Sequence, residues 1–160
     1  MNKIITLIFL TLSLLLGNGP AKEFKKPPLS FSLPLLKTIQ KNAIIMGTGP
    51  VQAHVFIDPV CPRSQDFVTL IAENKKMQSL YTYHFYLYEL ERFHSKALIQ
   101  WIYRSDDLKQ ALIDVMVKKI QPLLAKGQKS SETIKLIKKI ATKIGVYKRP
   151  YLILVKKGKK

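Results

Sequence analysis

A short apolar run, a proline-containing turn, a cysteine and a helical pattern follow one another within residues 55–67. Val55, Phe56 and Ile57 are β-branched or aromatic residues that favour a buried strand. Cys61, the single cysteine of the 160-residue chain, follows the turn. A cysteine at the start of a helix meets unpaired backbone N–H groups and the positive end of the helix dipole, and both favour the thiolate. This stretch requires a fold in which a strand leads directly into a helix.

The first 21 residues have the pattern of a secretory signal peptide. Lys3 precedes an apolar run over residues 4–16, which gives way to small and turn-forming residues at 17–21. A membrane-spanning helix needs about 20 apolar residues, so a cleaved signal fits this shorter run better than a permanent anchor. We expect cleavage near Ala21, contact with the membrane only before cleavage, and an exported mature protein.

A lone cysteine cannot form a disulfide within its own chain. Exported proteins occupy compartments in which disulfides persist. Cys61 is therefore interpreted as a reactive thiol or as one half of an intermolecular disulfide. An inert core cysteine is the alternative, and a lone cysteine in an arbitrary protein is more often of that kind.

Lysine and arginine outnumber the acidic residues by 27 to 10, which gives the chain a net charge of +17. Such a charge attracts anions such as nucleic acid, acidic lipid, glycan or acidic protein. The lysines are not interleaved with aromatic residues as in single-strand binders, and export also argues against a nucleic-acid partner. A lysine-rich composition without a dedicated partner is the simpler interpretation, and an anion-binding basic protein stays open as an alternative.

The remaining pattern predicts a mixed sheet with helical cover. Strands are expected at residues 43–47, 52–57, 80–87 and 151–155, and the third of them should be a central strand covered on both faces. Helices are expected at residues 62–76, 95–125 with a break near 105–107, and 130–144 before Gly145. A basic linker precedes residues 29–39, where Pro34 limits the expectation to a short strand or a single helical turn.

His54, His84 and His94 have no metal-ligand spacing among themselves or with Cys61, so neither a metal nor a cofactor is expected. Asp58 is either a proton relay near the thiol or a turn-forming residue before a proline. The turn is the interpretation we favour.

Three stretches together carry a resemblance to a known family. Residues 43–47 and 54–62 resemble the approach to a CxxC motif, including an acid three residues before the cysteine, and residues 101–116 are similar to a helical insertion. Residues 144–153 resemble the strand that bears a cis-proline. In this order, over residues 43–156, the sequence resembles the thioredoxin-fold thiol–disulfide proteins of the bacterial periplasm, most closely disulfide isomerases of the DsbC/DsbG type.

The resemblance implies an α/β fold, a thioredoxin-like mixed β-sheet with helices on both faces and a helical insertion at about residues 95–144. We expect a signal peptide at residues 1–21, a basic linker and short N-terminal element at 22–42, and the thioredoxin-like domain at 43–160. Compared with that family, we expect a domain truncated at its C-terminus, without the closing strand and final helix, and without the separate N-terminal dimerisation domain.

The site residues carried over by the resemblance are Cys61, Pro62, Arg63, Ser64, Arg149 and Pro150. Cys61 would be the nucleophile, Pro62 would fix the turn, and Arg63 and Ser64 would stabilise the thiolate. The Arg149-Pro150 pair, in which Arg149 replaces the usual Thr or Val, would add charge and an edge for docking a peptide.

The second cysteine of the family motif is replaced by Ser64, so the motif is CxxS and the protein is a monothiol. Net dithiol oxidation or reduction by this chain alone is therefore not expected. We expect action on cysteines of periplasmic proteins, as an isomerase-like or mixed-disulfide-trapping factor that can also exchange with a redox partner or a small thiol. The alternative is a non-catalytic scaffold or chaperone-like subunit of an envelope assembly.

Overall fold

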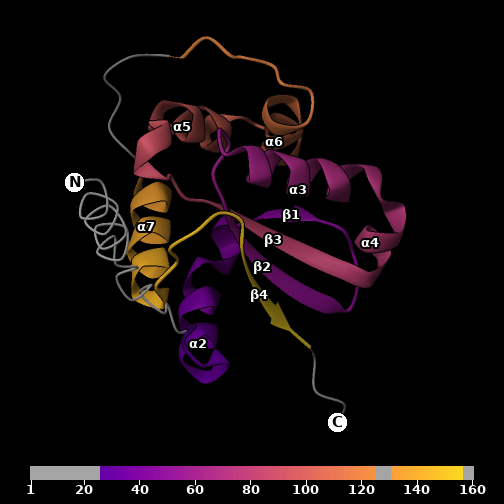
Figure 1. Ribbon diagram of the computed structural model, residues 1–160, viewed down its shortest axis with the longest axis vertical. Coiled ribbons are helices and arrows are strands. Elements are labelled where there is room, and N and C mark those ends of the chain that lie inside the picture. The colour runs from indigo at the N-terminus through magenta and orange to yellow at the C-terminus, as the bar shows by residue number, and fades with distance from the viewer. Residues whose placement is uncertain (1–25, 125–130, 157–160) are drawn as a thin grey trace, which may run out of the picture.

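The structure is a computed structural model that describes residues 26–124 and 131–156. The expected signal peptide lies outside these ranges. The strands are β1 (Ile44–Met46), β2 (Val51–Ile57), β3 (Tyr81–Leu87) and β4 (Tyr151–Val155). The helices are α2 (Leu29–Ile39), α3 (Pro62–Glu73), α4 (Lys75–Leu80), α5 (Lys96–Arg104), α6 (Leu108–Met116) and α7 (Glu132–Ile144), with 3₁₀ turns at Gln40–Asn42 and Glu91–Phe93 (Figure 1). In the described ranges, no helix has both the length and the apolar character needed to cross a membrane.

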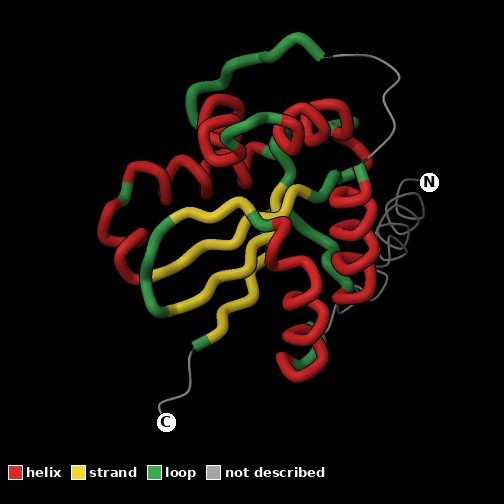
Figure 2. The backbone as a smooth tube through the Cα atoms, turned by 180° about the vertical axis from the view of Figure 1, so that it is seen from behind, coloured by secondary structure: helices red, strands yellow, loops and turns green. Residues whose placement is uncertain are grey.

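The strands form one mixed sheet in the spatial order β1-β3-β2-β4. β2 and β3 run parallel with His54 opposite His84, whereas β1 and β4 pair antiparallel with β3 and β2 respectively. β3 is thus an inner strand, and its residues 83–87 are buried, which confirms the expectation from its apolar character on both faces. Figure 2 shows the sheet from behind, with helices on both sides of it.

Alternate residues of the inner strands point into two separate cores. Ala53, Val55 and Ile57 pack with side chains of α3, α5 and α6 on one face of the sheet. Phe56 and Tyr86 pack with α2 and α7 on the other face. The expected α/β architecture with helices on both faces is confirmed (Figures 1 and 2).

The connection from β1 to β2 crosses the beginning of β3, because β3 lies between these two strands in the sheet. Gly49 passes so close to β3 that an added Cβ would lie 2.0 Å from the carbonyl carbon of Leu80. Gly47 has a φ of +84°, and a Cβ there would lie 2.4 Å from the carbonyl oxygen of Tyr81. Both positions therefore require glycine.

Residues 29–39 form the helix α2, so the prediction of a short strand or a single turn is wrong. Leu36 and Ile39 are fully buried in the core shared with α7. Packing of an apolar face supplies most of the stability of a helix in a protein, and here it outweighs the unfavourable Pro34. The carbonyl that Pro34 leaves without a helical partner belongs to Ser30, an exposed residue, and can bind water.

The helix expected over residues 62–76 ends earlier, at Glu73. Asn74 separates α3 from α4, because its Oδ1 accepts a hydrogen bond from the N–H of Met77 at 3.0 Å and so caps α4. The sequence pattern predicts one helix here, but capping by Asn74 divides it into two helices.

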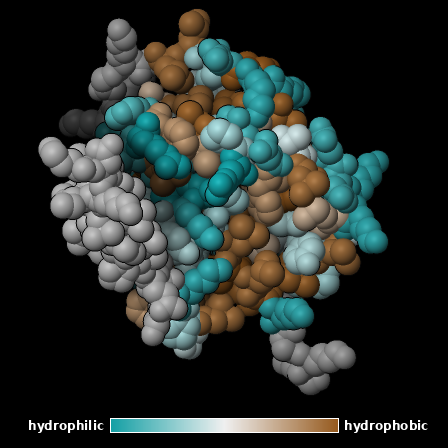
Figure 3. Space-filling view, in the orientation of Figure 1, coloured by the Kyte–Doolittle hydropathy of each residue, from teal (hydrophilic) through white to brown (hydrophobic). Residues whose placement is uncertain are grey.

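The segment between β3 and β4 contains α5, α6 and α7. The break expected near residues 105–107 is present, and the Asp107 side chain caps α6. The helix expected to continue to residue 125 ends at Met116, so that prediction is too long. The helix α7 ends as expected at Gly145, which has a φ of +75°. Figure 3 shows apolar surface at the top of the molecule, over the segment that follows α6, where Leu123 is 99% exposed.

Candidate functional site

Cys61 lies where β2 has ended and α3 is about to begin, as its sequence context predicts. It is the N-cap residue of α3, and Pro62 occupies the first turn, where a missing N–H has no cost. Its carbonyl accepts from the N–H groups of Ser64 and Gln65 at 2.9 and 3.0 Å, which fixes the first turn of the helix. Its side chain is 3% exposed.

The Arg149-Pro150 segment, which the resemblance assigns to the site, lies against Cys61. The Arg149-Pro150 peptide bond is cis, and the Cys61 Sγ donates to the Arg149 carbonyl at 3.8 Å. β4 begins directly after Pro150 and pairs with β2, so the start of β4 and the end of β2 lie together at one edge of the sheet. Residues 88 positions apart in the sequence thereby form one site.

The side chain of Arg149 points into the protein and is buried. Its Nε donates to the carbonyl of Tyr88 at 2.8 Å, and its Nη2 donates to that of Glu89 at 3.2 Å. Its Nη1 donates to the carbonyls of Val146 and Lys148 at 3.3 and 3.0 Å. The guanidinium also lies 3.9 Å from the centre of the Tyr88 ring. Arg149 thus joins the segment after β3 to the segment before β4.

Burial lowers the pKa of the Arg149 guanidinium below its usual value, and interactions with Tyr88, Asp58 and Cys61 oppose this effect. Arginine is charged throughout the physiological range, so Arg149 places a positive charge close to the Cys61 thiol. The α3 N-terminus adds its own partial positive charge from the other side.

Asp58 is completely buried and connects the turn before Cys61 to the segment after β3. Its Oδ1 accepts from the N–H of Val60 at 2.9 Å, which is the turn-forming bond that we favoured. Its Oδ2 accepts from the N–H of Leu90 at 2.5 Å and from the Ser95 hydroxyl at 2.9 Å. The carboxylate therefore holds two loops together at the C-terminal ends of β2 and β3.

The other expected site residues lie around Cys61 in different ways. Ser64 is fully buried, and its Oγ accepts from the N–H of Asp58 at 3.3 Å. Within the described residues, Ser64 makes no hydrogen bond to the Cys61 sulfur. Pro62 and Arg63 are exposed on the first turn of α3, where both are accessible to a partner.

His54 and His84 form a stacked pair on β2 and β3, with ring centroids 4.7 Å apart. His54 Nδ1 bonds with the Tyr86 hydroxyl at 3.0 Å, and His84 Nε2 bonds with the Gln52 amide oxygen at 2.7 Å. Burial and the neighbouring His84 lower the pKa of His54 from 6.5 to about 4, and burial also lowers the pKa of His84. The described residues contain no group of three or more His, Cys, Asp or Glu that could hold a metal ion.

No model of a protein family matches this sequence, and no curated protein matches it. Among solved structures, the chain is similar to a disulfide interchange protein from Neisseria gonorrhoeae, with a TM-score of 0.57. The match covers 71% of this chain and 80% of that chain at 19% sequence identity. The fold is thioredoxin-like. At this identity the similarity establishes the architecture of the chain.

Within this thioredoxin-like fold, three contributors to the site were missed by sequence reasoning. Tyr88 covers the Arg149 guanidinium, Glu89 supplies a carbonyl, and Ser95 bonds with Asp58. The sequence indicates these residues only by their position, because all three follow the predicted inner strand β3. A strand parallel to β2 ends at the same edge of the sheet, so the residues that follow it are brought close to Cys61.

Proposed function

We propose that this chain is an exported monothiol protein that exchanges disulfides with periplasmic proteins through Cys61, in the manner of DsbC/DsbG-type isomerases. One observation carries the proposal: the Cys61 sulfur stands at the start of α3 and contacts the carbonyl that precedes cis-Pro150 at 3.8 Å. The thioredoxin-like architecture and the signal-peptide pattern of residues 1–21 support it further.

The exchange begins when the Cys61 thiolate attacks one sulfur of a client disulfide. A bond forms between the two sulfurs, the client S–S bond breaks, and the second client sulfur leaves as a thiolate. Another client thiolate, or a small thiol, then attacks the mixed disulfide and releases Cys61 as the thiolate. No electrons are gained or lost overall when the second thiolate belongs to the client.

Such a cycle needs no second cysteine in the protein. Ser64 has no thiol with which to attack the mixed disulfide, so the adduct lasts until an external thiolate resolves it. Long-lived adducts suit a protein that rearranges or traps non-native disulfides better than one that oxidises clients. The charge of Arg149 and the N-terminus of α3 lie beside the sulfur at which both steps take place.

A non-catalytic scaffold or chaperone-like subunit of an envelope assembly is the second candidate. The burial of Cys61 favours it, since a sulfur that is 3% exposed has to be uncovered or closely approached before it can attack a client. The two candidates differ in whether partner binding depends on the sulfur.

Adducts trapped in cells distinguish the candidates. Cells producing the wild type or the Cys61→Ala variant are quenched in acid, their thiols are alkylated, and envelope proteins are separated without reductant. We expect reductant-sensitive adducts of this chain with the wild type and none with the variant. A partner that co-purifies equally with both proteins, without any adduct, would favour the scaffold instead.

A further inference from the structure

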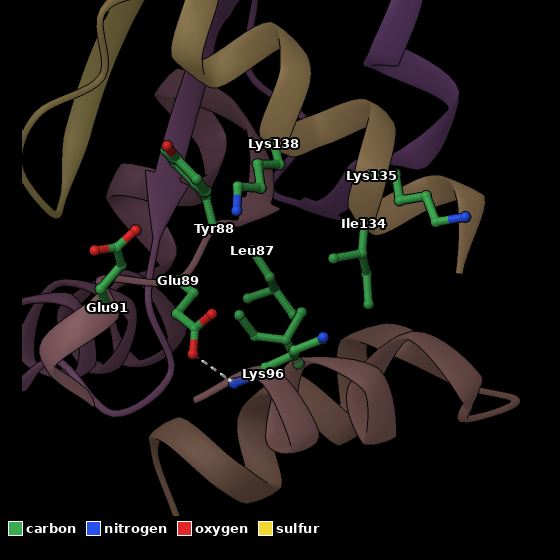
Figure 4. Close-up of a pocket in the computed structure, with 9 residues that line it drawn as sticks. Leu87, Tyr88, Glu89, Glu91, Lys96, Ile134, Lys135 and Lys138 are labelled. Atoms are coloured by element: carbon green, nitrogen blue, oxygen red, sulfur yellow. Dashed lines mark hydrogen bonds between the residues drawn. The ribbon is translucent and has the colours of Figure 1, made fainter. Parts of the chain in front are cut away.

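A cavity of about 340 Å³ opens beyond the C-terminal end of β3, between α5 and α7 (Figure 4). Leu87, Ile99 and Ile134 supply its apolar lining, each from a different element. Lysines of α5 and α7 stand at its rim. This volume is at the lower end of the range for ligand sites, and the combination of an apolar lining with a few charged groups is typical of such sites.

Two of the lysines are unpaired. Within the described part of the chain, neither Lys96 nor Lys138 forms an ion pair, whereas Lys135 pairs with Glu132 at 2.6 Å. Figure 4 shows the Lys138 ammonium directed toward Leu87 and the Lys135 ammonium directed away from the cavity. Lys138 thus places a positive charge next to apolar surface without a neutralising carboxylate.

The carboxylate of Glu89 contacts the start of α5. Glu89 Oε1 accepts from the backbone N–H of Lys96 at 3.0 Å, at the start of α5, where the helix dipole favours a negative charge (Figure 4). The carboxylate of Glu91 lies on the side of the cavity away from Ile134 in the same view. Glu89 and Glu91 also line the cavity, but neither forms an ion pair with Lys138 within the described residues, so the Lys138 ammonium is available to an anionic group that enters beside it.

The cavity shares part of its lining with a second hollow that reaches Arg149. A second hollow of about 460 Å³ is lined by Tyr88, Glu89 and Glu91, which also line the first cavity, and by Arg149. The carbonyl groups of Tyr88 and Glu89 accept from Arg149, whose own carbonyl accepts from the Cys61 thiol. Residues 88–91 therefore lie between the cavity and Arg149, the residue whose carbonyl contacts the Cys61 thiol.

Resting on the proposed thiol exchange, we propose that this cavity docks a client segment in which an aliphatic side chain is followed by an acidic residue. The aliphatic side chain occupies the space among Leu87, Ile99 and Ile134. The carboxylate pairs with Lys138 and Lys96. The site thereby selects cysteine-containing clients with an acidic, apolar flank.

Binding of a non-reactive peptide tests the docking separately from the chemistry. The probes are fluorescent peptides with serine in place of cysteine and a Leu-Glu, Leu-Lys or Ser-Glu pair on either flank. They are titrated into the mature wild type, the Lys138→Glu variant and the Lys139→Glu variant. Lys138 and Lys139 are adjacent exposed residues of α7, and only Lys138 lines the cavity, so the two variants change the net charge equally.

We expect the Leu-Glu peptide to bind the wild type and the Lys139→Glu variant alike, and the Lys138→Glu variant about tenfold more weakly. The other two peptides should bind the wild type more weakly than the Leu-Glu peptide. Equal weakening by both variants, or no preference among peptides, would contradict the proposal. Binding of octanoate at Lys138 without binding of any peptide would also contradict it, since the occupant would then be a small amphiphile.

Cysteine versions of the same peptides separate this inference from the proposed function. Mixed disulfides that form at equal rates with all peptides and variants would leave the exchange intact and overturn the docking. Leu-Glu binding that depends on Lys138, together with no mixed disulfide at Cys61, would leave the docking intact and overturn the exchange.

Discussion

Arg149 occupies the position before Pro150, yet its guanidinium turns away from solvent and bonds with four backbone carbonyls. A buried charge is tolerated in a protein only when its hydrogen-bonding groups are satisfied, as they are here. The Arg149 side chain therefore holds the segment after β3 against the segment before β4. It also places a positive charge close to Cys61.

Replacing Arg149 with Thr should lower the free energy of unfolding by about 3 kcal/mol, because buried carbonyls lose their charged donors. Urea titration of the mature protein measures this change. Arg63→Thr is the matched control, since that arginine is exposed and its loss should change stability by less than about 0.5 kcal/mol. Equal losses for both variants would mean that the contacts of Arg149 do not stabilise the fold.

Ser64 lies three residues after Cys61, the spacing that a CxxC motif gives its second cysteine. The Ser64→Cys variant should form a disulfide with Cys61 under mild oxidation, because the first turn of α3 brings these positions together as in CxxC proteins. Thiol titration should find two free thiols in the reduced variant and none in the oxidised one. Ser64→Ala should retain one thiol throughout, and a Ser64→Cys variant that keeps both thiols would contradict the expected geometry.

The buried histidine pair should make stability depend on pH. The pKa of His54 is about 4 in the folded protein and 6.5 ordinarily, so between these values the unfolded chain binds more protons. The free energy of unfolding should therefore fall as the pH decreases from 6.5 to 4, by at most about 3 kcal/mol from this residue.

Urea titrations across this pH range compare the wild type with the His54→Gln variant. Glutamine can still bond with the Tyr86 hydroxyl but does not titrate, so the variant should show a smaller loss of stability in acid. His94→Gln, at an exposed residue, should follow the wild-type profile. Parallel profiles for all three proteins would contradict the role of His54.

At the level of elements, the crossing between β1 and β2 depends on two glycines that touch the backbone of β3. Gly49→Ala should reduce the free energy of unfolding by about 3 kcal/mol or more, because its Cβ would collide with the Leu80 backbone and β3 or the crossing would have to shift. Gly145→Ala is the matched control. Its Cβ would meet nothing within 4 Å, so only the φ of +75° opposes it, at about 1 kcal/mol. Thermal or urea unfolding measures both, and equal costs would contradict the close approach.

Most elements could be predicted because their patterns are local. The alternation of β3, the capped pattern of α7 and the apolar run of β4 each lie within a single segment. The helix α2 was missed because its stability comes from packing against α7, which outweighs the local effect of Pro34. The end of α3 was misplaced because one side chain, Asn74, caps a new helix.

The site was predicted only in part, because some of its contacts join residues that are far apart in the sequence. Cys61 could be located because strand, turn and helix signals surround it in the sequence. Arg149 bonds with the carbonyl groups of residues 88 and 89, and Asp58 bonds with Leu90 and Ser95. These bonds join residues that lie 32 to 61 positions apart in the sequence. No spacing rule predicts such contacts, because they depend on which strands run parallel and end at the same edge.

At the scale of the whole molecule, the sheet topology assembles the site. The parallel strands β2 and β3 end together, which places the Cys61 turn beside residues 88–95. β4 runs antiparallel to β2, so the segment before it arrives at the same edge. We propose that this arrangement makes Cys61 a nucleophile for disulfide exchange.

The most direct measurement mixes the purified mature protein with a test protein whose disulfides have been scrambled, without added reductant other than a trace of glutathione. We predict that native disulfides return faster than without the protein, and that acid quenching captures an adduct linked through Cys61. The Cys61→Ala variant should give neither result. Equal rates of recovery with the wild type and the variant, with no adduct for either, would contradict the claim that Cys61 exchanges disulfides.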